Sequence, residues 1–301
     1  MLDTIPSKDL KYIGKPVERD DAIEKLTGQA LYTGDLEFAG MLHAKLLRSP
    51  YARAKIISID ISKAQKLPGV HAVLTGKDLH YRVGLYLVDK HIMAKHITRH
   101  YGEAVAAVAA ETPEIAQKAV DLIKVEYEEL TPFLDATKVF DKDVPLVHPD
   151  LGRYSYIKEV FTPVPGTNIA NHTKLRKGDV EEGFKNADYV FEREYTNPNV
   201  QHVPMETHIA IGKWDIGDRI TIYTSAQSPF TVRNLFSFSF GISHSNIRVI
   251  TPYVGGGFGG KAGIGLEPLV CCLSKAAGGR HVKLQATREE EFSLLPCRSG
   301  L

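Results

Sequence analysis

The densest group of residues that could bind a ligand is a glycine-rich run at residues 254–261, of sequence VGGGFGGK. Glycine occupies all but one of positions 255–260, so the backbone can approach a partner closely there. Successive N–H groups in such a loop can form a concave donor site for an anion or an oxo group. We expect a helix to begin just beyond the loop, and Lys261 could neutralise a phosphate.

The alternative for this run is a flexible or tightly packed turn without a ligand. Phe258 argues against simple flexibility, because a large ring among glycines suggests a fixed pocket wall. The run is also not a Walker A loop, which needs Gly-Lys-Ser/Thr, and it lacks the acidic residue that follows a dinucleotide fingerprint.

A second segment, residues 201–208 (QHVPMETH), contains possible metal ligands in His202, Glu206 and His208. Their spacing differs from the His-Glu-x-x-His zinc helix, and Pro204 would break that helix. We therefore favour a structural role, in which buried polar groups orient neighbouring loops.

A third segment, residues 224–229 (TSAQSP), places Gln227 between a predicted strand and a predicted helix. A glutamine amide there can donate a hydrogen bond to an anionic or oxo ligand. Taken alone, an ordinary helix cap by Ser225 or Ser228 is the simpler interpretation.

The elements that must position these segments follow from hydrophobic periodicity and turn signals. Residues 104–110 (AVAAVAA) predict a strand that is buried on both faces. Thr112 and Pro113 then predict a capped helix start. Other strands are predicted at residues 41–49, 54–60, 70–75, 123–128, 189–195, 208–213, 220–224, 247–250 and 282–286, and other helices at 62–67, 178–184, 230–240 and 267–275.

This order gives an α+β fold in several parts. Residues 1–20 form an extended arm or a disordered tail, residues 21–133 a first domain, residues 134–170 a proline-containing linker, and residues 171–301 a second domain. The formal net charge of +1 provides no bulk field for nucleic acid or an anionic membrane. The three cysteines fit no metal spacing, and no secretory signal or membrane span is visible, so we expect a cytoplasmic protein.

The three segments occur in an order that resembles the xanthine dehydrogenase/aldehyde oxidase family of molybdenum hydroxylases. Four further runs are similar to its α/β hammerhead domain, namely GQALYTGDL (28–36), RSPYA (48–52), LPGV (67–70) and YGEAVAAVA (101–109). METH (205–208), AQ (226–227), the glycine run and TREEE (287–291) are similar to the first part of its molybdopterin-binding domain. The likeness extends over nearly the whole chain. Within the family, the chain resembles nicotinate-dehydrogenase-like members.

The resemblance implies a molybdenum–molybdopterin cofactor, in the cytosine dinucleotide form. It implies that Gln227 contacts the apical ligand of molybdenum, without ligating the metal, and that the backbone of Gly256, Gly257, Phe258, Gly259 and Gly260 holds the cofactor, with Phe258 nearest the metal. In the family such a cofactor hydroxylates a carbon beside nitrogen or oxygen with oxygen from water, and electrons leave through 2Fe–2S clusters to FAD. These groups would belong to an iron–sulfur subunit and an FAD subunit.

Two departures bear on activity. Ala262 and Gly263 stand where purine-oxidising members have an acidic residue, and Glu267 further on is expected to be structural. The family's general-base glutamate is expected beyond Leu301, on a second half of the subunit, so no catalytic residue is assigned in this chain. We expect an N-heteroaromatic substrate, nicotinate-like or purine-like; an aldehyde or an aromatic acyl-CoA are alternatives. A non-catalytic assembly half-subunit is a further alternative, and a phosphate- or nucleotide-binding protein a distant one.

Overall fold

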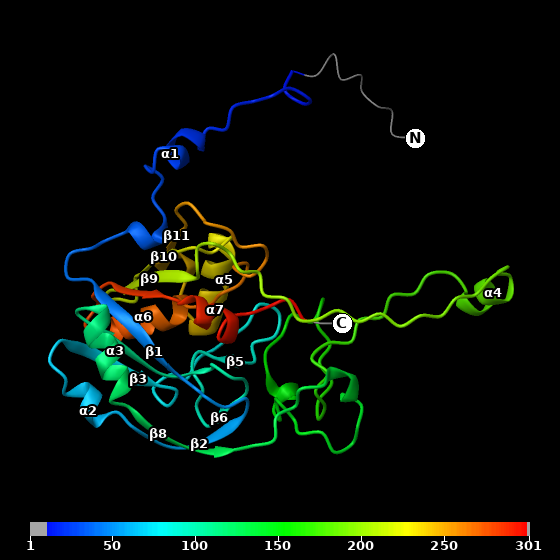
Figure 1. The fold of residues 1–301 in the computed structure, drawn as a ribbon, viewed down its shortest axis with the longest axis horizontal. Coiled ribbons are helices and arrows are strands. Elements are labelled where there is room, and N and C mark those ends of the chain that lie inside the picture. The colour runs from blue at the N-terminus through cyan, green and yellow to red at the C-terminus, as the bar shows by residue number, and fades with distance from the viewer. Residues whose placement is uncertain (1–10, 300–301) are drawn as a thin grey trace.

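The computed structural model describes residues 11–299, and its main body is built around one mixed sheet (Figure 1). The sheet has seven strands in the order β11-β10-β9-β12-β1-β7-β3. Their bounds are β11 Ile247–Ile250, β10 Ile220–Thr224, β9 Ile209–Trp214, β12 Val282–Gln285, β1 Leu42–Arg48, β7 Ala104–Ala110 and β3 Val70–Thr75. Strands from both ends of the chain therefore lie in a single sheet.

The register joins the early and late strands directly. β1 pairs in parallel with β12, Leu42 opposite Val282, and β12 pairs antiparallel with β9. On its other side β1 pairs antiparallel with β7, which was predicted from its run of small apolar residues. All seven residues of β7 are buried, as expected for a strand covered on both faces.

A second, smaller sheet lies beside the first and has the order β6-β2-β8. Its strands are β2 Ala54–Asp60, β6 Ile97–Thr98 and β8 Lys124–Glu129, and β4 Arg82–Val83 pairs with β5 Lys90–His91 nearby. Helix α3 (Pro113–Asp121) packs on β1 and β7, and the Thr112 hydroxyl accepts from the amide of Ile115, which confirms the predicted cap. Short helix α2 (Ser62–Gln65) lies beside it.

Helices α5 (Pro229–Phe240) and α6 (Glu267–Ala276) pack against the late strands. Leu269, Val270 and Leu273 of α6 are buried, as predicted. The α5 side contributes an aromatic group in which Phe236 and Phe240 stack at 4.2 Å and Trp214 meets Phe240 edge-on. This core fixes the strands whose ends carry the candidate ligand-binding residues.

The proline-containing segment after β8 wraps over the early strands. It includes short 3-10 turns at Ala136–Lys138 and Leu151–Arg153. Leu151 and Tyr154 are buried against Leu87 in a small hydrophobic cluster of their own. The segment is therefore anchored at Leu151 and Tyr154, while most of its other residues are exposed or partly buried.

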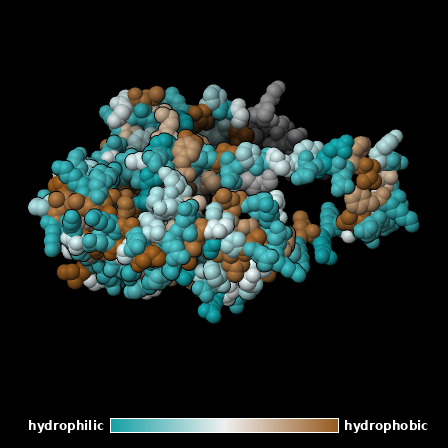
Figure 2. Space-filling view, turned by 60° about the horizontal axis from the view of Figure 1, so that its bottom comes forward, coloured by the Kyte–Doolittle hydropathy of each residue, from teal (hydrophilic) through white to brown (hydrophobic). Residues whose placement is uncertain are grey.

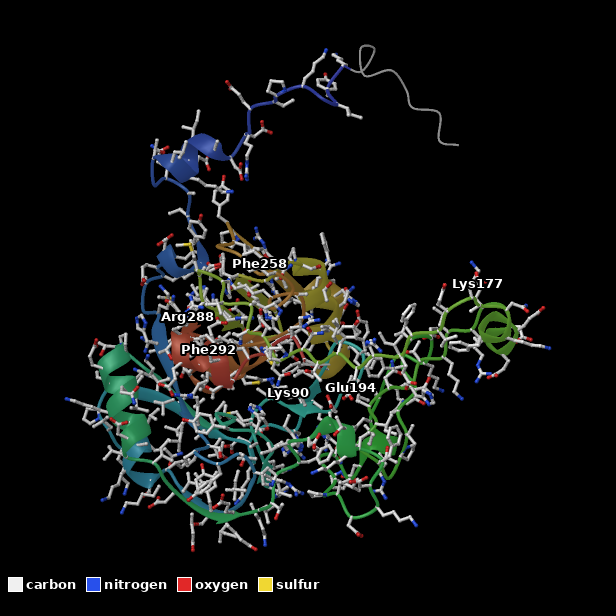
Figure 3. The ribbon with its side chains drawn as sticks, turned by 45° about the vertical axis from the view of Figure 1, so that its right-hand side comes forward. Lys90, Lys177, Glu194, Phe258, Arg288 and Phe292 are labelled. Atoms are coloured by element: carbon white, nitrogen blue, oxygen red, sulfur yellow. The ribbon has the colours of Figure 1, made fainter. Side chains whose placement is uncertain are left out.

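Residues 172–200 project from the body as an exposed excursion that carries helix α4 (Val180–Lys185) (Figures 1 and 2). The strand predicted at residues 189–195 is wrong, because this stretch of the structure is irregular and unpaired. Tyr189, Phe191 and Tyr195 are about four-fifths exposed. Strand propensity reflects packing on neighbouring strands, and the described residues offer none here. Lys177 and Glu194, labelled in Figure 3, lie on the two legs of the excursion.

The N-terminal arm is described only in part, since residues 1–10 lie outside the described residues. Residues 11–20 are exposed and lead into helix α1 (Ala22–Leu26). The remaining elements are the 3-10 turns Thr33–Asp35 and His244–Asn246 and helix α7 (Arg288–Ser293). Across residues 11–299 the structure contains no helix with the length and apolar character of a membrane span.

Candidate functional site

The candidate site lies at one edge of the large sheet, where four segments meet. β10 and β11 are parallel, and β12 is antiparallel to the same neighbour, β9, as β10 is. The carboxyl ends of β10, β11 and β12 and the amino end of β9 therefore share this edge. The chain leaves them as the Gln227 turn, the glycine loop and helix α7, and enters β9 from His208. Segments far apart in sequence are thus placed side by side by strand order alone.

The side chain of Gln227 lies against the glycine loop. Its oxygen accepts hydrogen bonds from the amides of Gly259, at 2.9 Å, and Lys261, at 3.3 Å. The backbone amide of Gln227 also donates to the carbonyl of Lys261 at 2.9 Å. These bonds fix the orientation of the amide group. Its nitrogen has no acceptor within residues 11–299, so its two donor hydrogens are available.

Three successive backbone amides of the loop, those of Gly256, Gly257 and Phe258, have no acceptor in the part of the chain that the structure describes. The amides on either side are used: Gly255 donates to Glu206, and Gly259 donates to Gln227. Unpaired donors in succession form the kind of concave site that binds anionic or oxo groups.

Glycine is required in the loop for two separate reasons. Gly256 and Gly259 have φ values of 97° and 94°, which side chains rarely adopt. At Gly257 a Cβ atom would lie 2.5 Å from the oxygen of Gln227. The Gln227 amide and the free loop donors can converge only because this side chain is absent.

Phe258 projects from the loop (Figure 3). Its ring is 73% exposed, and its backbone is left-handed with φ 52°. The sequence predicts a pocket wall at this position, and in the structure Phe258 is largely exposed. A non-glycine residue with positive φ is strained, so surrounding contacts must hold it in this conformation.

Lys261 does not face a ligand, contrary to the expectation that it could neutralise a phosphate. Its side chain is fully buried, and its ammonium pairs with the carboxylate of Glu206 at 2.9 Å. The same carboxylate oxygen accepts from the amide of Gly255 at 2.9 Å. The pair thus ties together the two ends of the glycine loop. The helix expected after the loop is α6, which begins at Glu267 as predicted, so a short irregular segment separates its amino end from Lys261.

His208 holds the loop from another side. One ring nitrogen lies 3.1 Å from the carbonyl oxygen of Gly260, and the other lies 2.9 Å from a carboxylate oxygen of Glu291 in α7. No group of three or more His, Cys, Asp or Glu side chains that could hold a metal ion occurs within residues 11–299. The hydrogen bonds of His208 and the pair between Glu206 and Lys261 agree with the structural interpretation of the 201–208 segment, in which polar groups orient neighbouring loops.

The comparisons with known proteins agree with this geometry. Residues 27–131 match the family described as aldehyde oxidase and xanthine dehydrogenase, a/b hammerhead domain, and residues 161–301 match the molybdopterin cofactor-binding domain. The chain belongs to the xanthine dehydrogenase/aldehyde oxidase family.

Three similar proteins illustrate how closely the chain resembles other members of the family. A xanthine dehydrogenase molybdenum-binding subunit of Escherichia coli is 33% identical over 91% of the chain. The nicotinate dehydrogenase large molybdopterin subunit of Eubacterium barkeri is 33% identical over 95% of it. The crystal structure of quinoline 2-oxidoreductase from Pseudomonas putida 86 superposes with a TM-score of 0.78, at 32% identity over 93% of the chain. The chain spans 36%, 64% and 35% of these three proteins, respectively.

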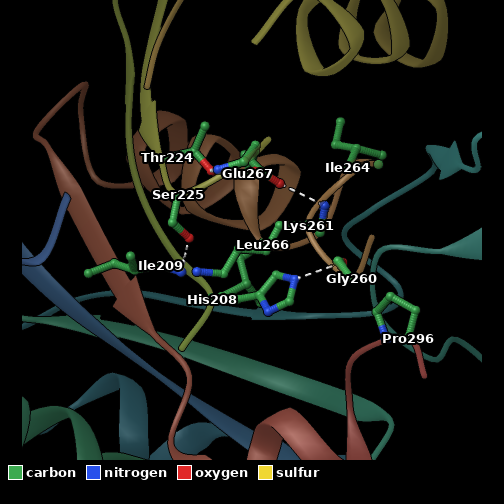
Figure 4. A pocket seen from close by; sticks show the side chains of 13 residues that line it. His208, Ile209, Thr224, Ser225, Gly260, Lys261, Ile264, Leu266, Glu267 and Pro296 are labelled. Atoms are coloured by element: carbon green, nitrogen blue, oxygen red, sulfur yellow. Dashed lines mark hydrogen bonds between the residues drawn. The ribbon is translucent and has the colours of Figure 1, made fainter. Parts of the chain in front are cut away.

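Next to the glycine loop lies a small, partly open cavity of about 40 Å³, which suffices for a single water molecule (Figure 4). Its lining includes His208, Lys261 and Glu267. Glu267 accepts from the Thr224 hydroxyl at 2.6 Å and from the amide of Gly265 at 2.7 Å. Glu267 is therefore structural, as expected from the sequence.

A much larger cleft of about 1210 Å³ shares part of this lining, including Gly260 and Pro296, and extends between residues 85–103 and α7. Gly259, Gly260 and Ala262 form part of its wall, with Lys90 and Phe292 from other elements (Figure 3). The sequence analysis did not predict this cleft, nor that α7 lines it through Phe292. The acidic first turn of α7 and its Thr287 capping box were the available signals.

The structure also tests the helix-cap interpretation of the turn at residues 224–229. Ser228 caps α5, its hydroxyl accepting from the amide of Thr231, so the helix-cap interpretation of this turn is confirmed. The cap leaves Gln227 available, because the two side chains have different partners.

Proposed function

We propose that the edge formed by Gln227 and residues 256–260 holds the molybdenum–molybdopterin cofactor of a molybdenum hydroxylase. The observation that carries this is the run of three unpaired amides beside the oriented Gln227 amide. Oxo and phosphate groups are acceptors, and they need several preorganised donors with little side-chain bulk. The donor set and the missing Cβ at Gly257 fit that requirement.

In this proposal Gln227 donates its free amide hydrogens to the apical ligand of molybdenum. The backbone from Gly256 to Gly260 contacts the cofactor, which is expected in its cytosine dinucleotide form, and exposed Phe258 shields the side nearest the metal. When bound, the cofactor supplies the chemistry of hydroxylation with water-derived oxygen.

For the substrate we infer an N-heteroaromatic compound, nicotinate-like or purine-like. The names of similar proteins support this class, since they include a nicotinate dehydrogenase, a xanthine dehydrogenase and a quinoline oxidoreductase. Ala262 and Gly263, next to buried Lys261, leave no acidic side chain directly after the loop for a purine. This favours a nicotinate-like substrate over xanthine bound through an acidic residue at that position.

The proposal assigns no general base to the described residues. The carboxylates nearest the loop are engaged: Glu206 by Lys261, Glu267 by Thr224 and Glu291 by His208. We therefore propose that the base lies on a second half of the subunit. Iron–sulfur and FAD subunits would complete the electron path in a cytoplasmic complex, and residues 134–170 would link the hammerhead region to the cofactor region.

A Gln227→Glu variant tests the proposal sharply. It keeps the side-chain oxygen that accepts from Gly259 and Lys261, but replaces the donor nitrogen with a second acceptor. The control is Gln117→Glu, the same change on the exposed face of α3. Each chain would be produced in cells that make the cofactor, and its molybdenum and pterin would be measured together with its thermal unfolding.

We expect Gln227→Glu to unfold like the wild-type chain and to lose most of its molybdenum and pterin, while Gln117→Glu retains both. Equal cofactor content in the two variants would contradict the role given to Gln227. A well-folded wild-type chain without pterin, even with its partners, would favour the assembly half-subunit instead.

A further inference from the structure

The imidazole of His208 lies between two groups that accept hydrogen bonds. One ring nitrogen, Nε2, is 3.1 Å from the carbonyl oxygen of Gly260 (Figure 4). The other, Nδ1, is 2.9 Å and 3.1 Å from the two carboxylate oxygens of Glu291. Both side chains are largely removed from water, with 12% of His208 and 1% of Glu291 exposed. The backbone amide of His208 donates to the same carboxylate.

The chemistry of these two partners determines how many protons the His208 ring carries. A backbone carbonyl and an ionised carboxylate can only accept, so each ring nitrogen must carry a hydrogen. Burial would raise the pKa of Glu291, but hydrogen bonds from His208 and the nearby charge of Lys261 outweigh it and lower that pKa. The lowered pKa keeps Glu291 an acceptor, so the ring nitrogen that faces it is placed to donate.

The charges packed around the pair are consistent with this assignment. Lys261 is buried beside it but is neutralised by Glu206. Glu267 lines the same cavity, and both its oxygens accept hydrogen bonds from other residues. Glu290, the neighbour of Glu291 on α7, caps the helix and faces Arg48. The Glu291 carboxylate thus faces the His208 ring, and this ring has no other carboxylate partner among the described residues.

We propose that His208, held as an imidazolium by Glu291, is a positioning residue that pins Gly260 and through it the ligand-binding face of the glycine loop. The amide of Gly260 donates to the carbonyl of Gly257 at 2.8 Å, so a fixed Gly260 also fixes Gly257. Gly257 carries one of the three free amides. This inference rests on the proposed function only in naming the pterin cofactor as the group that the loop holds.

The test compares Glu291→Gln with Glu289→Gln. Glu291→Gln keeps the size of the side chain and an accepting oxygen, but removes the charge that holds the second ring proton. Glu289→Gln makes the same change on the same helix at a side chain that is 68% exposed. Two readouts are needed: the ¹⁵N chemical shifts of the His208 ring in the full chain, and the rate of pterin release from the holo-complex.

We expect both ring nitrogens of His208 to be protonated in the wild-type chain and in Glu289→Gln at neutral pH, and only one in Glu291→Gln. Mutation of residues that orient a ligand-binding group without touching the ligand typically weakens ligand binding by roughly ten- to a hundredfold. Pterin release should therefore accelerate by that factor in Glu291→Gln alone. A singly protonated ring in the wild-type chain would overturn the proposal, as would unchanged release from folded Glu291→Gln.

The two proposals can fail separately. If the wild-type chain held no pterin, the proposed function would fail. The ¹⁵N shifts and the hydrogen exchange of the Gly257 and Gly260 amides would still decide whether His208 pins the loop. Slow exchange at Gly260 that becomes at least tenfold faster in Glu291→Gln would support the pin, and equal exchange in both chains would refute it.

Discussion

The buried pair between Lys261 and Glu206 should dominate the stability of the glycine loop. The Lys261 side chain is 0% exposed and that of Glu206 is 12% exposed, with 2.9 Å between the charged atoms. Replacing Lys261 with Met keeps the length of the side chain but leaves the Glu206 carboxylate without its cation. One oxygen of this carboxylate already lacks any hydrogen-bond partner among the described residues.

Removal of one partner from a buried ion pair costs about 3–5 kcal/mol, because the remaining charge is neither hydrated nor compensated. We expect that loss for Lys261→Met, measured by urea unfolding of the full chain. Glu206→Gln should be costly for the same reason. The double variant should cost less than the sum of the two by up to about 3 kcal/mol, because both charges are then gone.

The control is Lys55→Met, which breaks a pair with Glu128 whose side chains are more than half exposed. Such surface pairs contribute about 0–1 kcal/mol. If Lys261→Met cost no more than Lys55→Met, the ammonium would not be compensating a buried charge. The assignment of Lys261 to the frame of the loop would then be refuted, and a direct contact with a phosphate would become tenable again.

Other predictions concern the core, the pH dependence and the thiols. Gly212→Ala should lower the free energy of unfolding by about 1–3 kcal/mol, because its Cβ would lie 2.8 Å from the backbone nitrogen of Cys271. Burial lowers the pKa of His91 to about 4, whereas it is near 6.5 in an unfolded chain. The unfolded state therefore binds more protons between these values, so the free energy of unfolding should fall as pH drops from 6.5 to 4. Because the ring is only half-buried and solvent screens it, we expect a fall of about 1–2 kcal/mol, and a urea series on His91→Gln should show a smaller fall. Thiol titration of the folded chain should modify exposed Cys297 alone, since burial raises the pKa values of Cys271 and Cys272; rapid reaction of a second thiol would contradict this.

The sequence predicted those elements whose signals are local. The strand at residues 104–110 could be predicted because small apolar residues on both faces suit a fully covered strand. The helix after it could be predicted because Thr112 and Pro113 favour a capped start. Neither prediction depends on knowing the neighbours of the segment.

Predictions that depend on distant partners were less successful. Tyr189, Phe191 and Tyr195 favour a strand, but strand formation depends on pairing that the described residues do not provide. Lys261 looked like a phosphate ligand because its partner, Glu206, is 55 positions away. The contact of His208 with Glu291 spans 83 positions. Only the order of strands in the sheet brings such residues together.

The shared sheet also explains why a hammerhead region accompanies the candidate cofactor edge. Because β1 is parallel to β12, its carboxyl end reaches the same edge as α7. There Arg48 donates to Ser293 at 2.8 Å and lies 3.6 Å from the buried carboxylate of Glu290. Gly102 packs so closely on Ser293 that a Cβ would lie 2.6 Å from it. The early part of the chain therefore fixes the helix that carries Glu291, and through His208 it helps to set the glycine loop.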